Sequence, residues 1–172
     1  MKNTIHSSFA RDASSRLYTM KVTLIEGPIS KDFALRNPEV SRTIRMGGGA
    51  TLSDLHRAIY GAFDRTMDRP YEFQFDRSPS VSGHLCYGIP EHCRDIYGDP
   101  IHAGDASATA LDTLGIKAGD SFGYWFDFAE IWLHRIDVLD ITGDKAHAGP
   151  EVIERVGESP SPLPRGDMLF RS

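Results

Sequence analysis

An alternation of apolar and polar positions runs through residues 122–139 and predicts two neighbouring strands. Aromatic side chains occupy every second position from Phe122 to Phe128, and a second alternation starts at Trp132. A period of two is typical of strands with one buried face. Because Ala129 and Glu130 interrupt the pattern, we predict a hairpin with a tight connection at these residues. One face of its second strand carries Trp132, His134, Ile136 and Val138.

Periodicity elsewhere predicts further strands and one long helix. A strand begins at Tyr18 and ends before Gly27-Pro28, and others are predicted at Ser41–Met46 and Tyr71–Phe75. From Thr51 to Phe63, apolar residues recur at steps of three and four, which is typical of a helix with one buried stripe. Thr51 and Asp54 have the spacing of a capping box, so the helix should begin there.

The remaining segments are predicted to be less regular. We expect Ile29–Val40 to be irregular and residues 76–106 to form a long loop. A short helix is predicted at Thr109–Leu114, with Gly115 ending it. The triplet Gly47-Gly48-Gly49 lacks the lysine and spacing of a phosphate-binding loop, so a flexible turn is the favoured interpretation and a phosphate cradle the alternative.

The order of these elements predicts an α+β fold. Each half of the chain has strands, then a capped helix, then a strand that carries aromatic residues. That order is similar to a β-grasp unit, so we predict two β-grasp-like half-units, each a mixed sheet with one helix, sharing one core. The predicted domain spans residues 17–158, between a flexible tail at 1–16 and a Pro-rich tail at 159–172.

Composition narrows the functional classes. The 172 residues include 19 basic and 24 acidic side chains, and the resulting net charge of −5 disfavours a nucleic-acid partner, which needs a basic face. No apolar run reaches the roughly 20 residues that span a bilayer, so no membrane partner is expected. The start of the chain lacks the apolar segment of a secretory signal, and two cysteines make no disulfide framework. We therefore expect a cytoplasmic protein.

The predicted hairpin also holds the first candidate chemistry. His134 shares a face with apolar residues, and a buried imidazole needs a partner. In one interpretation Asp127 or the backbone supplies that partner, and the role is structural. In the other, Asp127, Glu130 and His134 line a pocket with His56 from the long helix, as acid–base or metal-binding groups. Both interpretations stay open at the level of sequence.

A second candidate site lies in the predicted loop. Soft sulfur and imidazole ligands at this density could hold zinc, although their spacing matches no standard zinc module. The alternative is two reduced cysteines that pack the loop against the core. The four candidate ligands are His84, Cys86, His92 and Cys93, with His102 further along.

Two motifs resemble those of the plasmid pRiA4b ORF-3-like family. That family carries a Tyr-x-Tyr-Asp-Phe-Gly-Asp-x-Trp-x-His-x-Ile run and an earlier Leu-x-x-Leu-His-x-x-Ile helix. The second motif is matched by Leu52–Ile59, which includes His56. Ala129 and Glu130 depart from the family's Gly and Asp, and Ala129 bears on any backbone that needs a positive φ. The first motif is matched at Tyr124, Phe126, Asp127, Phe128, Trp132, His134 and Ile136.

The resemblance implies an uncharacterised α+β protein, since no activity is assigned to the family. Some members are labelled passenger or resolvase-like proteins of mobile elements, but a DNA transaction conflicts with the net charge. We therefore predict a soluble binding module for a protein or small-molecule ligand, with an aromatic groove as its site. The alternative is a metal-assisted hydrolase-like enzyme that uses Asp127, Glu130 and His134. The predicted groove anchors are Tyr124, Trp125, Trp132 and Arg135.

Overall fold

The computed structural model describes residues 16–75, 85–89, 102–143 and 149–161, and every structural statement below concerns these residues. The elements in chain order are β1 (Arg16–Glu26), α1 (Lys31–Arg36), β2 (Ser41–Gly47), α2 (Leu52–Ala62), β3 (Tyr71–Phe75), β4 (Leu85–Gly88), β5 (His102–Asp105), the 3₁₀ turn η1 (Leu111–Thr113), β6 (Ser121–Phe126), β7 (Trp132–Gly143) and β8 (Glu151–Val156).

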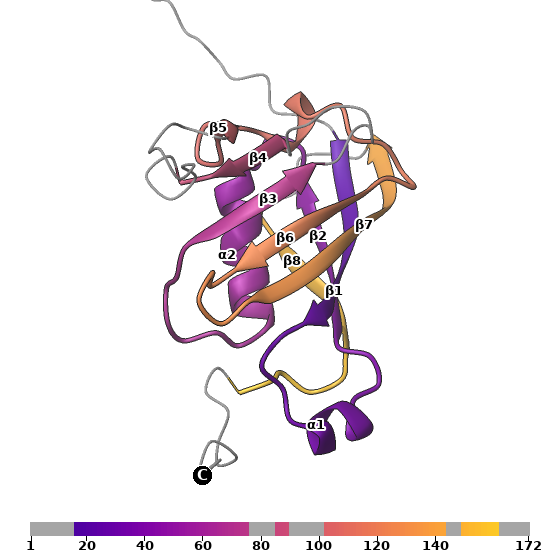
Figure 1. The fold of residues 1–172 in the computed structure, drawn as a ribbon. Helices are drawn as coiled ribbons and strands as arrows, with labels where there is room; N and C mark the ends of the chain where they lie inside the picture. The colour runs from indigo at the N-terminus through magenta and orange to yellow at the C-terminus, as the bar shows by residue number, and fades with distance from the viewer. Residues whose placement is uncertain (1–15, 76–84, 90–101, 144–148, 162–172) are drawn as a thin grey trace, which may run out of the picture.

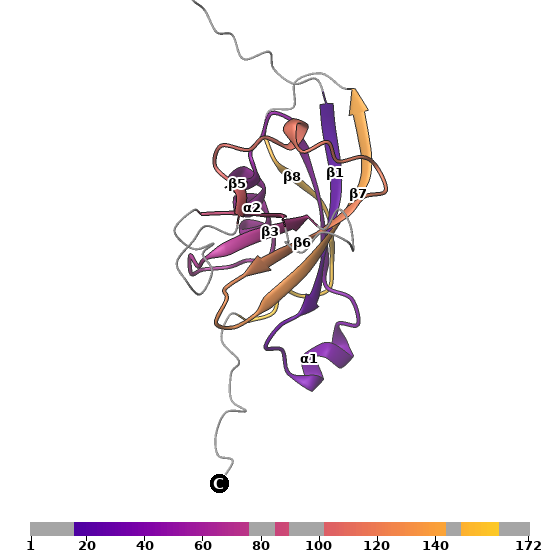
Figure 2. The same cartoon turned by 45° about the horizontal axis from the view of Figure 1, so that its top comes forward.

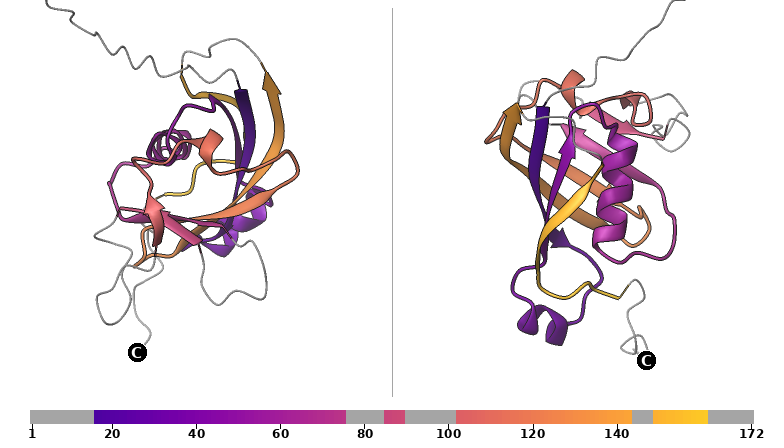
Figure 3. Two further views of the ribbon diagram at one scale, coloured as in Figure 1. Left: turned by 90° about the horizontal axis from the view of Figure 1, so that it is seen from above. Right: turned by 180° about the vertical axis from the view of Figure 1, so that it is seen from behind.

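The strands form one mixed eight-stranded sheet in the order β5-β4-β3-β6-β7-β1-β2-β8 (Figure 1). All neighbours pair antiparallel except β4 and β5, which are parallel. The sheet is strongly curved, and α2 lies in its hollow (Figure 3). The short helix α1 lies beyond the end of β1 (Figure 2). None of its residues is fully buried, and Phe33 packs partly against the core. The core therefore lies between α2 and the concave face of the sheet.

Helix α2 begins where the sequence predicts. The Thr51 hydroxyl accepts a hydrogen bond from the Asp54 amide, and the Asp54 carboxylate accepts one from the Thr51 amide, which completes the capping box. The apolar stripe faces the sheet, with Leu52 and Leu55 at 0% exposure. Capping and stripe together confirm the predicted helix.

The central hairpin is also confirmed. β6 and β7 pair antiparallel, with Tyr124 opposite His134 and Phe126 opposite Trp132. The expected alternation holds, because all four of these side chains are buried on the concave face. The bounds of the other predicted strands agree as well, because β1, β2 and β3 each start and end within two residues of the predicted positions.

In the connection of the hairpin, the residues with a left-handed backbone are not Ala129 but two of its neighbours. Positive φ angles occur at Asp127 (55°) and Ile131 (54°). Aspartate tolerates the left-handed region because its short side chain bonds to the nearby backbone. Here the Asp127 carboxylate accepts hydrogen bonds from the amides of Ala129 (3.2 Å) and Glu130 (3.4 Å). Alanine in place of the family's glycine therefore creates no conflict in this turn.

Several local predictions are corrected by the structure. The predicted loop 76–106 contains β4 and β5, and the segment predicted to be irregular, Ile29–Val40, contains α1. The predicted helix at 109–114 is only the 3₁₀ turn η1. Its first amides bond to distant carbonyls, since Leu111 donates to Ala50 and Asp112 to Gly48. The following amides, of Thr113 and Leu114, make bonds of the 3₁₀ type to Ala110 and Leu111.

The α+β class is confirmed, whereas the two β-grasp-like half-units are not. One continuous sheet covers one long helix, and no second helix packs in its hollow among the described residues. The Gly47–Gly49 turn receives a protein carboxylate: a Cβ at Gly48 would lie 2.2 Å from an Asp112 oxygen. This close approach explains a glycine there without phosphate.

Candidate functional site

A cavity lies beside α2 and β3 among the described residues, and we call it the α2–β3 cavity. Its volume is about 440 Å³, which suits a small ligand. The walls combine aromatic rings with convergent polar groups. They are formed by Ser53, His56, Arg57, Tyr60, Asp68, Tyr71 and Ile89.

His56 forms part of this wall and is held from two sides. Its Nδ1 lies 2.8 Å from the Tyr124 hydroxyl, and its ring stacks on Tyr71 at 3.7 Å between centroids and 5° between planes. The other ring nitrogen, Nε2, is 3.9 Å from a carboxylate oxygen of the exposed Asp68. Ser53 in turn fixes Tyr71, because their hydroxyl oxygens are 2.8 Å apart. The imidazole is therefore positioned, with one edge toward the cavity.

Electrostatics keep this imidazole neutral. Burial lowers the pKa of His56 to about 4, because a charged ring loses its hydration, and Asp68 offsets only part of that effect. The pKa of Tyr124 is raised well above 10, again chiefly by burial. At neutral pH, His56 and Tyr124 are both uncharged and share a hydrogen bond. His56 can therefore donate or accept at Nε2 but cannot act as a cation.

We expect Tyr124→Phe to lower the free energy of unfolding by about 1–3 kcal/mol, because His56 Nδ1 would lose its buried partner. Chemical denaturation at pH 7 measures this change. Tyr60→Phe is the matched control, since the Tyr60 ring is only partly buried and no hydrogen bond of its hydroxyl to the described residues is seen. Equal costs for the two variants would contradict the assigned hydrogen bond.

His134 is sealed in the core rather than placed in a cavity. It is 4% exposed, and its ring lies 5.0 Å from that of Phe63 and 5.3 Å from that of Tyr124. Neither ring nitrogen makes a hydrogen bond of ordinary geometry within the described chain, so Asp127 is not its partner. Of the two predicted partners, the backbone is the one that interacts with the ring, at Tyr124 and Trp132. Burial, aided by the nearby charge of Arg65, lowers the pKa of His134 to about 3. His134 is thus a neutral core residue.

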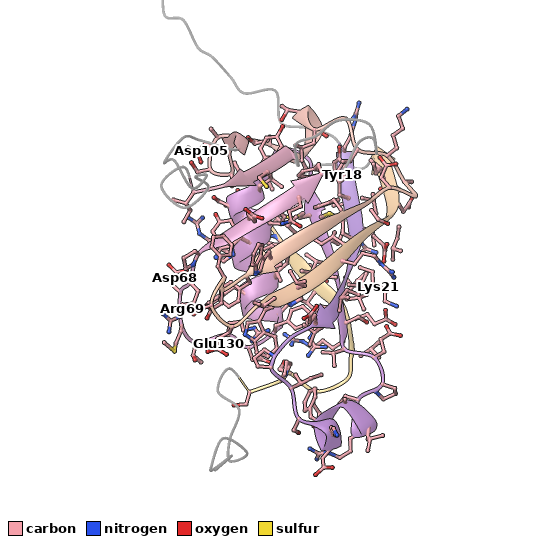
Figure 4. The ribbon with its side chains drawn as sticks, in the orientation of Figure 1. Tyr18, Lys21, Asp68, Arg69, Asp105 and Glu130 are labelled. Carbon is pink, nitrogen blue, oxygen red and sulfur yellow. The ribbon has the colours of Figure 1, made fainter. Side chains whose placement is uncertain are left out.

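Asp127 and Glu130 line a different and smaller space, which we call the hairpin cavity. Its volume is about 50 Å³. Asp127 pairs with Arg69, with 3.5 Å between its carboxylate oxygen and Nε. Figure 4 shows Asp68, Arg69 and Glu130 along one edge of the molecule, beside the end of the hairpin. The cavity is lined by Arg65, Thr66, Met67, Arg69, Phe126, Asp127, Glu130 and Trp132.

The four predicted acid–base residues therefore do not meet. His56 lines the α2–β3 cavity, Asp127 and Glu130 line the hairpin cavity, and His134 lines neither. The predicted groove anchors are also divided. Tyr124 and Trp132 are 2% and 1% exposed on the concave face, whereas Trp125 and Arg135 lie on the convex face of the same strands. One groove cannot contain all four anchors, because a pleated strand sends alternate side chains to opposite faces.

The predicted metal ligands are mostly beyond the described residues. Cys86 is buried in β4, while His84, His92, Cys93 and the side chain of His102 lie outside the described part. Within the described part, no three histidine, cysteine, aspartate or glutamate side chains gather closely enough to hold a metal ion. The described helices are also too short and too polar to cross a membrane.

Some residues that line these cavities are not among the site residues predicted from the sequence. Tyr60 follows His56 by one helical turn, so its place on the same face could have been expected. Asp68 and Arg65 lie in the connection between α2 and β3, where no periodicity shows which way a side chain points. Tyr71 was assigned to a strand but not to a site.

The fold and its cavities define an α+β protein with one curved sheet, one long helix in its hollow and a cavity at the edge of that helix. The family model described as plasmid pRiA4b ORF-3-like protein matches residues 29–162, and the chain belongs to this family. A search of curated proteins gives no match.

A solved structure has a similar fold. It is the crystal structure of protein of unknown function MM3350 from Methanosarcina mazei Go1, with a TM-score of 0.61 and 19% sequence identity. The match covers 81% of this chain and 69% of that one. At this identity the likeness supports the fold alone.

Proposed function

We propose that this protein is a binding module, and that its ligand enters the α2–β3 cavity and carries a planar ring. One observation supports this most strongly: three rings and three polar side chains converge on one cavity of about 440 Å³. Ligand sites commonly have such an apolar and aromatic wall with few polar groups that fix orientation. The aromatic site that we propose therefore lies beside His56, and not around Trp125 and Trp132 as predicted from the sequence.

The cavity suits a flat ligand with hydrogen-bonding edges. Tyr60 is partly exposed and offers a ring face, whereas His56 and Tyr71 stack on each other and offer only the small exposed parts of their rings. Such aromatic contacts favour planar groups over saturated ones of similar size. Asp68 has a largely exposed carboxylate, with its side chain 90% accessible, so it can accept hydrogen bonds from a ligand at the rim. Its carboxylate and the guanidinium of Arg57 give the rim both signs of charge.

Catalysis receives less support from the geometry. A general base and a nucleophile or metal must lie within hydrogen-bonding reach of one reacting group. Asp127 and Glu130 are separated from both histidines by their place in the hairpin cavity, and His134 is 4% exposed. The residues that the metal-assisted hydrolase hypothesis requires therefore share no common site in the described part of the chain.

The proposal is tested with small planar probes. Adenosine, indole and p-cresol are titrated by saturation-transfer NMR, with cyclohexanol as a non-planar control. We expect saturable binding of at least one planar probe and none of cyclohexanol. Tyr60→Leu should weaken binding roughly two- to tenfold, because it removes one stacking ring worth about 0.5–1.5 kcal/mol.

Trp125→Leu is the matched control, since Trp125 is also a partly buried aromatic residue but lies on the convex face. It should leave probe binding unchanged. Loss of binding in Trp125→Leu with binding retained in Tyr60→Leu would move the site to the convex face and overturn the proposal. So would equal binding of cyclohexanol and the planar probes.

A further inference from the structure

Arg65 is a buried cation next to the hairpin cavity. The residue is 7% exposed, and its guanidinium carbon lies 3.8 Å from the centre of the Trp132 ring and 5.6 Å from that of Phe126. Stacking on these rings fixes the plane of the guanidinium and leaves its edge for hydrogen bonds. The stack therefore holds the guanidinium in place beside the hairpin cavity, which Arg65 lines.

That edge lacks partners in the described chain. Both terminal nitrogens, Nη1 and Nη2, are buried without a hydrogen bond. The carboxylate of the hairpin turn, Asp127, already pairs with Arg69 and accepts hydrogen bonds from two turn amides. Burial lowers the pKa of Arg65 to about 10, so it remains charged at neutral pH, and a buried charge without a partner is costly.

We propose that the hairpin cavity is a binding site for one carboxylate group, held by the guanidinium edge of Arg65 with Arg69 at the mouth. This site goes beyond the ring-binding cavity beside α2, from which it is separate. A fixed guanidinium presents two parallel N–H groups whose spacing matches the two oxygens of a carboxylate. The unpaired nitrogens then gain charge-assisted hydrogen bonds.

The size and charge of the cavity favour a carboxylate over a phosphate. About 50 Å³ has room for one small planar group or very few waters. Asp127 and Glu130 also line the space, and their negative charges oppose a phosphate, with its charge of about −1.5 to −2, more than a singly charged carboxylate. The carboxylate can belong to a small acid or to the C-terminus of a peptide, which present the same chemistry.

Fluorescence of Trp132 can test the site directly. Trp125→Phe leaves Trp132 as the single tryptophan, in contact with Arg65. In this background, sodium acetate is titrated at constant ionic strength against sodium chloride, followed by acetyl-Ala-Ala-Ala as the free acid and as the C-terminal amide. We expect a saturable emission change with the carboxylates and none with chloride or the amide. Tighter binding of the free-acid peptide than of acetate would identify a peptide terminus, and the reverse a small acid.

Two variants decide whether Arg65 is responsible. Arg65→Lys keeps the charge but loses the two-pronged edge, and it should weaken carboxylate binding about tenfold or more. Glu130→Gln removes a neighbouring negative charge and should bind equally or more tightly. Unchanged binding in Arg65→Lys would overturn the proposal, as would an absence of saturable binding. Binding seen only in Glu130→Gln would show that Glu130 itself occupies the cavity, which also overturns it.

Discussion

Trp132→Ala is expected to lower the free energy of unfolding by about 3–5 kcal/mol, the usual cost of deleting a large buried aromatic side chain. Trp132 is 1% exposed and begins β7 at the end of the central hairpin. The indole lies against Gly27, where an added Cβ would be 2.4 Å from the ring, and against the guanidinium of Arg65. Alanine would leave a void between these neighbours and remove the surface on which Arg65 stacks.

Urea denaturation followed by circular dichroism measures the change. Trp125→Ala is the matched control, because it deletes the same side chain seven residues earlier, on the convex face. We expect a smaller loss there, about 1 kcal/mol, as is typical of residues away from the core. Losses of similar size in both variants would show that Trp132 is not the core residue of the pair. The comparison also separates a core role for Trp132 from the binding role first predicted for it.

Short-range patterns in the sequence were enough to predict the parts of the fold that local chemistry decides. The alternation of Phe122, Tyr124 and Phe126 and the capping box of Thr51 and Asp54 each specify a structure without distant contacts. Strands β4 and β5 have four residues each, and β5 depends on a parallel neighbour from another part of the chain. β8 exposes most of its side chains as an edge strand and shows no buried face.

The candidate site was less predictable, because convergence in space leaves no periodic signal. His56 was found, since a histidine on an apolar helix stripe is unusual enough to notice. Its contact with Tyr124, across 68 positions of sequence, requires the sheet to curve around α2. Arg65 lies in an irregular connection, where nothing in the sequence distinguishes a buried arginine from an exposed one. Asp127, a predicted acid–base residue, accepts hydrogen bonds from two amides of the hairpin turn, and such local bonds leave no signal in the apolar pattern.

The stability of the fold is expected to fall steeply as pH decreases from about 6 to about 4, because two buried histidines resist protonation. The pKa of His56 is about 4 and that of His134 about 3 in the folded state, against about 6.5 in the unfolded chain. Between these values the unfolded state binds more protons, so acid favours unfolding. Each histidine contributes about 1.4 kcal/mol per pH unit, or roughly 2.7 together. Below about pH 3 their contribution no longer changes.

His134→Leu isolates the contribution of the core histidine. The substitution removes two buried nitrogens that make no hydrogen bond of ordinary geometry to the described chain, and it keeps an apolar side chain against Phe63. We therefore expect little change in stability at pH 7. At pH 5 and 4 the variant should be more stable than the wild type, and the gap should widen by about 1.4 kcal/mol per pH unit. Urea denaturation at pH 7, 6, 5 and 4 measures both slopes. Carboxylates titrate in both proteins, so their effect cancels in the difference. Parallel slopes would mean that folded His134 is protonated as readily as in the unfolded chain, and would contradict its sealed, neutral place in the core.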